Sequence, residues 1–151
     1  MKHKAIIVDI DGTLSDNTHR LHYFTNHTQV TNWAPINELS KNDPPNVWCQ
    51  EMVHLYKKAG YKILFITGRA EDAKQVTVEW LTKHLDAGVD YELHMRGEFD
   101  RRDDYIIKLD IYNELIKQRY DVAFVVEDRQ SVVEMWRSIG LTCLQCKEAT
   151  Y

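Results

Sequence analysis

Five short apolar stretches alternate with amphipathic stretches along the chain. They predict strands at residues 4–10, 61–67, 90–95, 121–127 and 141–145, of which 90–95 has the weakest apolar character. Apolar residues at intervals of three or four predict helices over 46–59, 71–86, 104–118 and 130–139. Gly60, Gly88 and Gly140 stand where three of these helices are expected to stop. Alternating strands and helices predict an α/β fold with a doubly wound parallel sheet.

One segment breaks this alternation. Residues 13–45 separate the first strand from its helix and are polar, aromatic and rich in histidine. This is long for a connection between a strand and a helix, and long loops are usually functional. We expect a single domain over 1–151, with 13–45 as a flap over the carboxyl end of the sheet, where open parallel sheets bind ligands.

The first strand ends in two closely spaced aspartates. In AIIVDIDGTLSD, residues 5–16, Asp9 and Asp11 follow four apolar residues and precede a glycine. Residues i and i+2 of a strand point to the same side. Two carboxylates at about 4 Å repel each other by roughly 4 kcal/mol at an effective dielectric constant of about 20. Such a pair requires compensation, most simply by a divalent cation.

Two further strands also end in polar residues. Thr67, Gly68 and Arg69 end the second strand, and Glu127, Asp128 and Arg129 end the fourth. Alone, each residue fits a helix cap or an ordinary turn. Because the ends of parallel strands converge, however, together they predict a site for Mg²⁺ and a phosphate. In that site the Thr67 hydroxyl and the backbone N–H groups of a turn at Gly68 would bind the anion, and Arg69 would bind it through two hydrogen bonds.

Composition narrows the functional classes. The chain has 151 residues, 28% of them charged, and a net charge of −4, which argues against a basic nucleic-acid coat. No apolar run is long enough for a membrane span, and the amino terminus lacks the pattern of a signal peptide, so we expect a cytoplasmic protein. Cys143 and Cys146 form a C-x-x-C motif, but their odd spacing in a strand sends them to opposite faces, which favours ordinary strand residues with free thiols.

The motifs resemble a known superfamily. DIDGTL, ITGR, Lys108 and VVEDR, in this order, resemble the haloacid dehalogenase (HAD) superfamily of phosphotransferases. MRGEFDRRDDYIIK and DRQSVVEMWRSIG resemble the 3′-phosphatase domain of phage-type polynucleotide kinase–phosphatase. The chain contains no P-loop, so we expect a phosphatase module without its kinase half. If the chain is a phage protein, as the resemblance allows, the expected location is the cytoplasm of the host cell.

The resemblance also implies roles for individual residues. Asp9 would be the nucleophile that forms an aspartyl-phosphate, and Asp11 the general acid and then the general base. Mg²⁺ would be held by Asp9, Asp128 and the main-chain carbonyl of Asp11, with Glu127 supporting these ligands. Substrate would be bound by Arg20, Thr67, Gly68, Arg69, Arg96, Asp104 and Lys108. Asp104 and Lys108 are four residues apart on one helix, so Asp104 could hold Lys108 extended toward the phosphate, or form an ordinary surface ion pair.

Weaker signals have two readings each. Arg20, Arg96, Arg101 and Arg102 form either a positive rim for a nucleic-acid backbone or a solvated face. Tyr23, Phe24 and Trp33 would stack on a base or pack the flap onto the body. His19, His22 and His27 suggest a second metal site, but they share a polar loop in which we expect them to have no acidic or thiol partners.

The main hypothesis is a magnesium-dependent phosphatase that removes a terminal 3′-phosphate from DNA or RNA, a reaction of nucleic-acid repair. A phosphatase of free nucleotides is the alternative with the same chemistry. A phospho-acceptor signalling module would also gather aspartates, a threonine and a lysine on such a sheet, but it lacks the second aspartate of the D-x-D pair. A binding module without catalysis is disfavoured by the intact Asp9 and Asp11.

Overall fold

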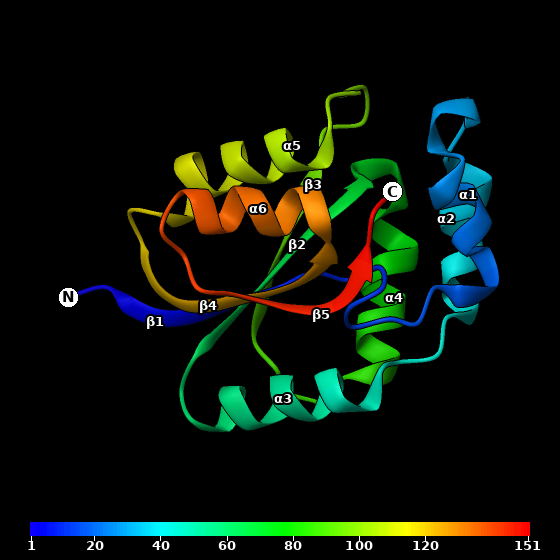
Figure 1. The fold of residues 1–151 in the computed structure, drawn as a ribbon. Coiled ribbons are helices and arrows are strands. Elements are labelled where there is room, and N and C mark those ends of the chain that lie inside the picture. The colour runs from blue at the N-terminus through cyan, green and yellow to red at the C-terminus, as the bar shows by residue number, and fades with distance from the viewer.

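A computed structural model describes residues 1–151 and contains a five-stranded, fully parallel sheet between two pairs of helices (Figure 1). The strand order is β3-β2-β1-β4-β5. The strands are β1 (His3–Val8), β2 (Lys62–Ala70), β3 (Tyr91–Arg96), β4 (Tyr120–Arg129) and β5 (Cys143–Ala149). β1 therefore lies at the centre of the sheet, between β2 and β4. This arrangement confirms the predicted doubly wound α/β fold.

Alternating side chains of the central strands feed two hydrophobic cores. Ala5 and Ile7 of β1 pack beneath α5 (Asp104–Ile111) and α6 (Gln130–Ser138), together with the buried ring of Trp136. Ile6 and Val8 point to the other face, beneath α3 (Val47–Lys58) and α4 (Lys74–His84). Because β1 is apolar on both faces, it is fixed at the centre of the sheet, and the residues that follow it are held at the same edge as the end of β4.

Element boundaries differ from the predicted ones in two informative places. β2 runs on to Ala70, so Thr67, Gly68 and Arg69 lie within the strand, at an irregularity in its pairing with β3, and not in a turn after it. The predicted helix over 104–118 ends its α-helical part at Ile111 and continues as a π-helical turn, Tyr112–Ile116. Helix α3 ends just before Gly60, as expected, whereas α4 ends at His84, short of Gly88.

Segment 13–45 folds into short helices beside the carboxyl ends of the strands (Figure 1). It contains α1 (Leu21–Thr25), α2 (Ala34–Glu38) and 3₁₀ turns at Thr18–Arg20, His27–Gln29 and Leu39–Asn42; a further 3₁₀ turn, Glu71–Ala73, precedes α4. The carboxyl-terminal end of segment 13–45 is attached to α4, because the indole of Trp80 donates a hydrogen bond to the carbonyl of Asp43 at 2.9 Å. None of the helices has the length and apolar character needed to cross a membrane.

Candidate active site

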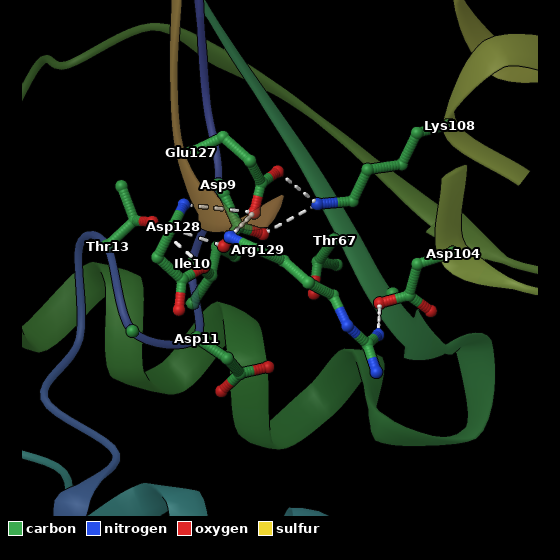
Figure 2. A network of polar contacts seen from close by, with 12 residues as sticks. Asp9, Ile10, Asp11, Thr13, Thr67, Asp104, Lys108, Glu127, Asp128 and Arg129 are labelled. Carbon is green, nitrogen blue, oxygen red and sulfur yellow. Dashed lines mark hydrogen bonds and ion pairs between the residues drawn. The ribbon is translucent and has the colours of Figure 1, made fainter. Parts of the chain in front are cut away.

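Three buried carboxylates meet at the tips of β1 and β4. Asp9 directly follows β1, where its N–H donates to the carbonyl of Val126 at 3.0 Å. Glu127 and Asp128 lie at the end of β4. One oxygen from each carboxylate lies within 4.8 Å of the others, and all three residues are buried. The predicted convergence of the strand ends therefore holds for these two strands (Figure 2).

A buried lysine from α5 is the one cation within this cluster. The Lys108 ammonium donates to Asp9 Oδ1 and to Glu127 Oε2, both at 2.8 Å (Figure 2). Burial alone would lower the pKa of Lys108, but the charges of Asp9 and Glu127 outweigh it and raise this pKa. Lys108 thus stays protonated and fixes both carboxylates.

Thr13 binds the second carboxylate oxygen of Asp9. Its hydroxyl donates to Asp9 Oδ2 at 3.2 Å and lies 3.5 Å from Asp128 Oδ1. The motifs predicted no role for Thr13. Its position four residues after Asp9, across a tight turn, could have indicated that the two side chains meet. Both oxygens of Asp9 are therefore oriented, one by an ammonium and one by a hydroxyl.

The acidic cluster brings together three carboxylates and one lysine. Burial and the neighbouring charge of Asp9 raise the pKa of Asp128 to about 7. The same two causes raise the pKa of Glu127 well above its usual value. The ionised carboxylates therefore repel one another despite Lys108, and a divalent cation would relieve this repulsion.

The oxygens left for a cation belong to Asp9 and Asp128. Glu127 Oε1 already accepts the N–H groups of Asp128 and Arg129 at 3.2 and 3.3 Å, and its other oxygen binds Lys108. Carboxylate oxygens are the ligands that Mg²⁺ prefers, and it commonly uses only one or two of them. The donor set therefore fits Mg²⁺, with Glu127 as a support for the main chain and the lysine.

The turn after β1 brings Asp128 against a glycine. Gly12 has a φ of +80°, and a side-chain carbon at this position would lie 2.2 Å from Asp128 Oδ2. Only glycine allows both the left-handed backbone and this close approach. The absence of a side chain at Gly12 therefore leaves space for the Asp128 carboxylate beside the turn.

Asp11 lies outside the acidic cluster (Figure 2). Its partners are two arginines. Arg69 donates to both of its oxygens, at 2.9 Å from Nε and 2.7 Å from Nη2, and Arg20 also binds Oδ1. Although burial opposes it, these guanidinium groups lower the pKa of Asp11 below its usual range. The expected repulsion between Asp9 and Asp11 is therefore relieved at Asp11 by arginines, and a cation is needed only at Asp9.

Asp43 is a further member of this network that the sequence reading missed. Its carboxylate accepts from Arg20 Nε at 2.9 Å and Nη2 at 2.5 Å, and from His19 Nε2 at 2.6 Å. Asp43 and Arg20 are both buried. Asp43 follows a lysine and an asparagine in a polar stretch, so nothing in the local pattern distinguished it from a solvated loop residue.

Asp104 contacts different partners from the ones expected. It binds Arg96 and, at 2.5 Å, Arg129 Nη1, and it makes no ion pair with Lys108. Burial raises its pKa, but the charges of Arg129, Lys108 and Arg96 prevail and lower it. The idea that Asp104 holds Lys108 extended is therefore wrong, since Glu127 and Asp9 do so.

The Thr67–Gly68 backbone packs against Asp104 and Arg96. A side-chain carbon at Gly68 would lie 2.6 Å from Asp104 Oδ2, and the Gly68 carbonyl accepts from Arg96 Nε at 2.8 Å. Thr67 is fully buried, and its hydroxyl accepts the N–H of Arg69 at 3.1 Å. Gly68 and Arg69 line the cavity described next, whereas Thr67 does not.

A cavity of about 630 Å³ opens above the acidic cluster. Its floor includes Asp9, Asp11, Lys108, Glu127 and Asp128. One wall comes from segment 13–45, and the other from residues 96–105 between β3 and α5. Of the arginines predicted as a positive rim, Arg20, Arg96 and Arg102 are bound to carboxylates, while Arg101 is exposed and forms no ion pair.

The remaining candidates are the loop histidines and the C-x-x-C cysteines. The expectation that the histidines lack an acidic partner is wrong for His19, whose Nε2 lies 2.6 Å from Asp43 Oδ1. The one group of possible metal ligands consists of Asp9, Glu127 and Asp128 and includes none of His19, His22 and His27. Cys143 is buried and Cys146 is exposed, and both are free thiols on β5.

The family model that matches this chain identifies its doubly wound sheet and buried acidic cluster as those of a phosphatase of the HAD superfamily. The fold is shared with the class C acid phosphatase from Bacillus anthracis, with a TM-score of 0.70, 15% identity, and coverage of 99% of this chain and 68% of that one. Residues 3–151 match the family model for the polynucleotide kinase PNKP phosphatase domain. The chain belongs to this family.

Two relatives are more similar to this chain in sequence than the acid phosphatase is. A protein of Autographa californica nuclear polyhedrosis virus, assigned as a bifunctional polynucleotide kinase/RNA ligase, is 29% identical over 138 residues, which are 91% of this chain and 18% of the viral protein. A chain of the solved Pnkp1/Rnl/Hen1 RNA repair complex has a TM-score of 0.82 and 30% identity, covering 99% of this chain and 44% of that one. The present chain thus spans less than half the length of either relative.

Proposed function

We propose that this domain removes a 3′-phosphate from polynucleotide ends in a magnesium-dependent reaction. The observation that carries the proposal is the meeting of Asp9, Asp128 and Lys108 at the strand tips, in a chain of the PNKP phosphatase family. The viral polynucleotide kinase relative and the RNA repair complex support a polynucleotide over a free nucleotide. The family match favours a phosphatase over the phospho-acceptor signalling module.

In the proposed reaction Asp9 attacks phosphorus. Lys108 and Thr13 hold its two carboxylate oxygens, so the nucleophile is oriented before substrate arrives. The bond between phosphorus and the 3′-oxygen breaks as the bond to Asp9 forms, and Asp11 gives the leaving oxygen a proton. Water then attacks the aspartyl-phosphate, Asp11 takes a proton from it, and phosphate leaves.

Asp9, Asp128 and the main-chain carbonyl of Asp11 would hold Mg²⁺, whose charge neutralises phosphoryl oxygens. Arg69 and Lys108 would bind substrate, beside Gly68, Arg96 and Asp104, which also line the cavity. Arg20 and Thr67 are fully buried and lie outside this lining, so they would support Asp11 and Arg69, which they contact. Because Arg69 now binds Asp11, a phosphate that draws Arg69 away would leave Asp11 able to hold a proton. Segment 13–45 would act as the flap of the single domain, since it lines the cavity.

The test compares a 3′-phosphorylated oligonucleotide with 3′- and 5′-mononucleotides as substrates. We expect kcat/KM to be highest for the oligonucleotide. Asp9→Asn should abolish turnover of all substrates while leaving the melting temperature close to that of the wild type, because a neutral amide does not attack phosphorus. A preference for mononucleotides would reject the polynucleotide assignment, and an active Asp9→Asn variant would reject the nucleophile.

A further inference from the structure

Three aromatic rings form one wall of the active-site cavity. Phe24 lies between Trp33 and Tyr151, with centroid distances of 5.5 and 5.7 Å. All three residues are half-buried and line the cavity. None of them belongs to either hydrophobic core. The rings therefore present apolar surface to the cavity and do not serve as packing for the interior.

This row of rings starts at the acidic cluster. The hydroxyl of Tyr151 donates to Asp128 Oδ2 at 3.2 Å, Phe24 packs against Tyr151, and Trp33 packs against Phe24. A phosphoryl group attached at Asp9 would therefore have the rest of its ester beside the rings. Aromatic rings bind nucleobases by stacking, with little preference for one base over another.

The other wall offers little net charge for a nucleic-acid backbone. Arg96, Arg102 and Arg129 each pair with a carboxylate of Asp104, Asp100 or Asp110. Arg101 is the exposed arginine of this wall without an ion pair. Ion pairs within the protein reduce what these arginines can contribute to phosphate binding, which supplies most of the affinity in nonspecific nucleic-acid complexes. The rings therefore offer a polynucleotide end a second contact, beside the proposed phosphate contacts of Arg69 and Lys108.

We infer that Phe24 and Trp33 stack on the nucleobase of the nucleotide that carries the scissile phosphate. The preferred substrate is then an unpaired polynucleotide end whose terminal base is intact. This inference rests on the proposed phosphatase activity and adds the feature of the substrate that is recognised. A base in a duplex must first leave its stack, so a paired end is expected to react more slowly than a single-stranded one.

The first test needs no variant. The wild-type domain is given two single-stranded oligonucleotides that differ only in the terminal residue, one with a normal 3′-phosphorylated nucleotide and one with a 3′-phosphorylated abasic residue. Stacking predicts a kcat/KM ratio of about 5- to 150-fold in favour of the intact base. A ratio near one overturns the inference and leaves the phosphatase proposal standing. Failure to hydrolyse either substrate overturns both.

The second test assigns the effect to the wall. Phe24→Ala and Trp33→Ala should each reduce the ratio severalfold, because they slow hydrolysis of the substrate with the intact base more than that of the abasic substrate. Phe24→Tyr, which keeps a ring, should retain the ratio. The matched control is Trp48→Ala, which removes an exposed indole on α3, outside the cavity. If the alanine variants slow both substrates equally, the rings have a structural role only and the stacking assignment is wrong.

Discussion

Replacing Asp43 with asparagine tests the buried charge network most sharply. Asp43 and Arg20 are both fully buried at their side chains, and Arg20 binds Asp43 through Nε and Nη2. A hydrogen bond to a charged group is worth about 1.5–3 kcal/mol, and breaking a buried ion pair costs about 3–5 kcal/mol. Asparagine keeps the volume and one acceptor, and Asp11 remains a partner of Arg20. We therefore expect Asp43→Asn to lower the free energy of unfolding by about 2–3 kcal/mol.

The assay is urea unfolding at neutral pH, which reports the free energy of unfolding directly. A double-mutant cycle with Arg20→Met isolates the pair, and the two substitutions should be clearly non-additive. Glu38→Gln is the control, since it breaks an exposed ion pair with Lys41 in the same segment, and pairs of this kind are worth about 0–1 kcal/mol. If Asp43→Asn costs no more than Glu38→Gln, or if the cycle is additive within about 0.5 kcal/mol, the reasoning is refuted.

Three further predictions concern magnesium, the Gly12 turn and acid stability. Millimolar Mg²⁺ should raise the melting temperature of the wild type but not of Asp128→Asn, because it relieves repulsion in the acidic cluster; equal shifts in both would place the ion elsewhere. Gly12→Ala should abolish activity, since the new carbon would meet Asp128 Oδ2 at 2.2 Å, whereas Gly60→Ala, with φ +90° and no atom within 4 Å, should cost about 1–2 kcal/mol of stability and leave activity intact. Loss of activity in both, or in neither, would contradict the steric argument. Hydrogen bonds from Arg119 lower the pKa of Glu92 to about 2, so this carboxylate stabilises the fold above its unfolded-state pKa of 4.5, and that contribution is lost as pH falls from there towards 2. Urea midpoints measured from pH 7 to pH 2.5 should therefore fall more in the wild type than in Glu92→Gln, and parallel profiles would show that Glu92 contributes nothing.

Much of the fold could be predicted because its signals are local. The apolar β1 segment, the amphipathic periods of α3 and α6, and the glycines after α3 and α6 each follow from a few neighbouring residues. The end of β2 could not be predicted, because Thr67, Gly68 and Arg69 have the composition of a turn. Pairing with β3 and packing against Asp104 hold them in the strand. These contacts come from β3 and α5, which lie much later in the sequence.

The acidic cluster was predictable for a related reason. The carboxyl ends of parallel strands lie at one edge of the sheet, so Asp9 and Asp128 were expected at the same edge. The strand order, which makes β1 and β4 neighbours, brings them together. The distribution of ion pairs was not predictable, because the sequence contains more arginines near the site than one pattern can assign. Helical spacing suggested Asp104 as the partner of Lys108, but the lysine reaches Asp9 and Glu127 in the interior. Asp43 required knowledge of where segment 13–45 returns to the body.

A crystal structure with Mg²⁺ and a fluoride mimic of the phosphoryl group tests the central claim directly. The account predicts the ion between the carboxylates of Asp9 and Asp128, and the mimic in line with an oxygen of Asp9 and bound by Lys108 and Arg69. An ion held by other residues, or a mimic seated away from Asp9, would contradict the account.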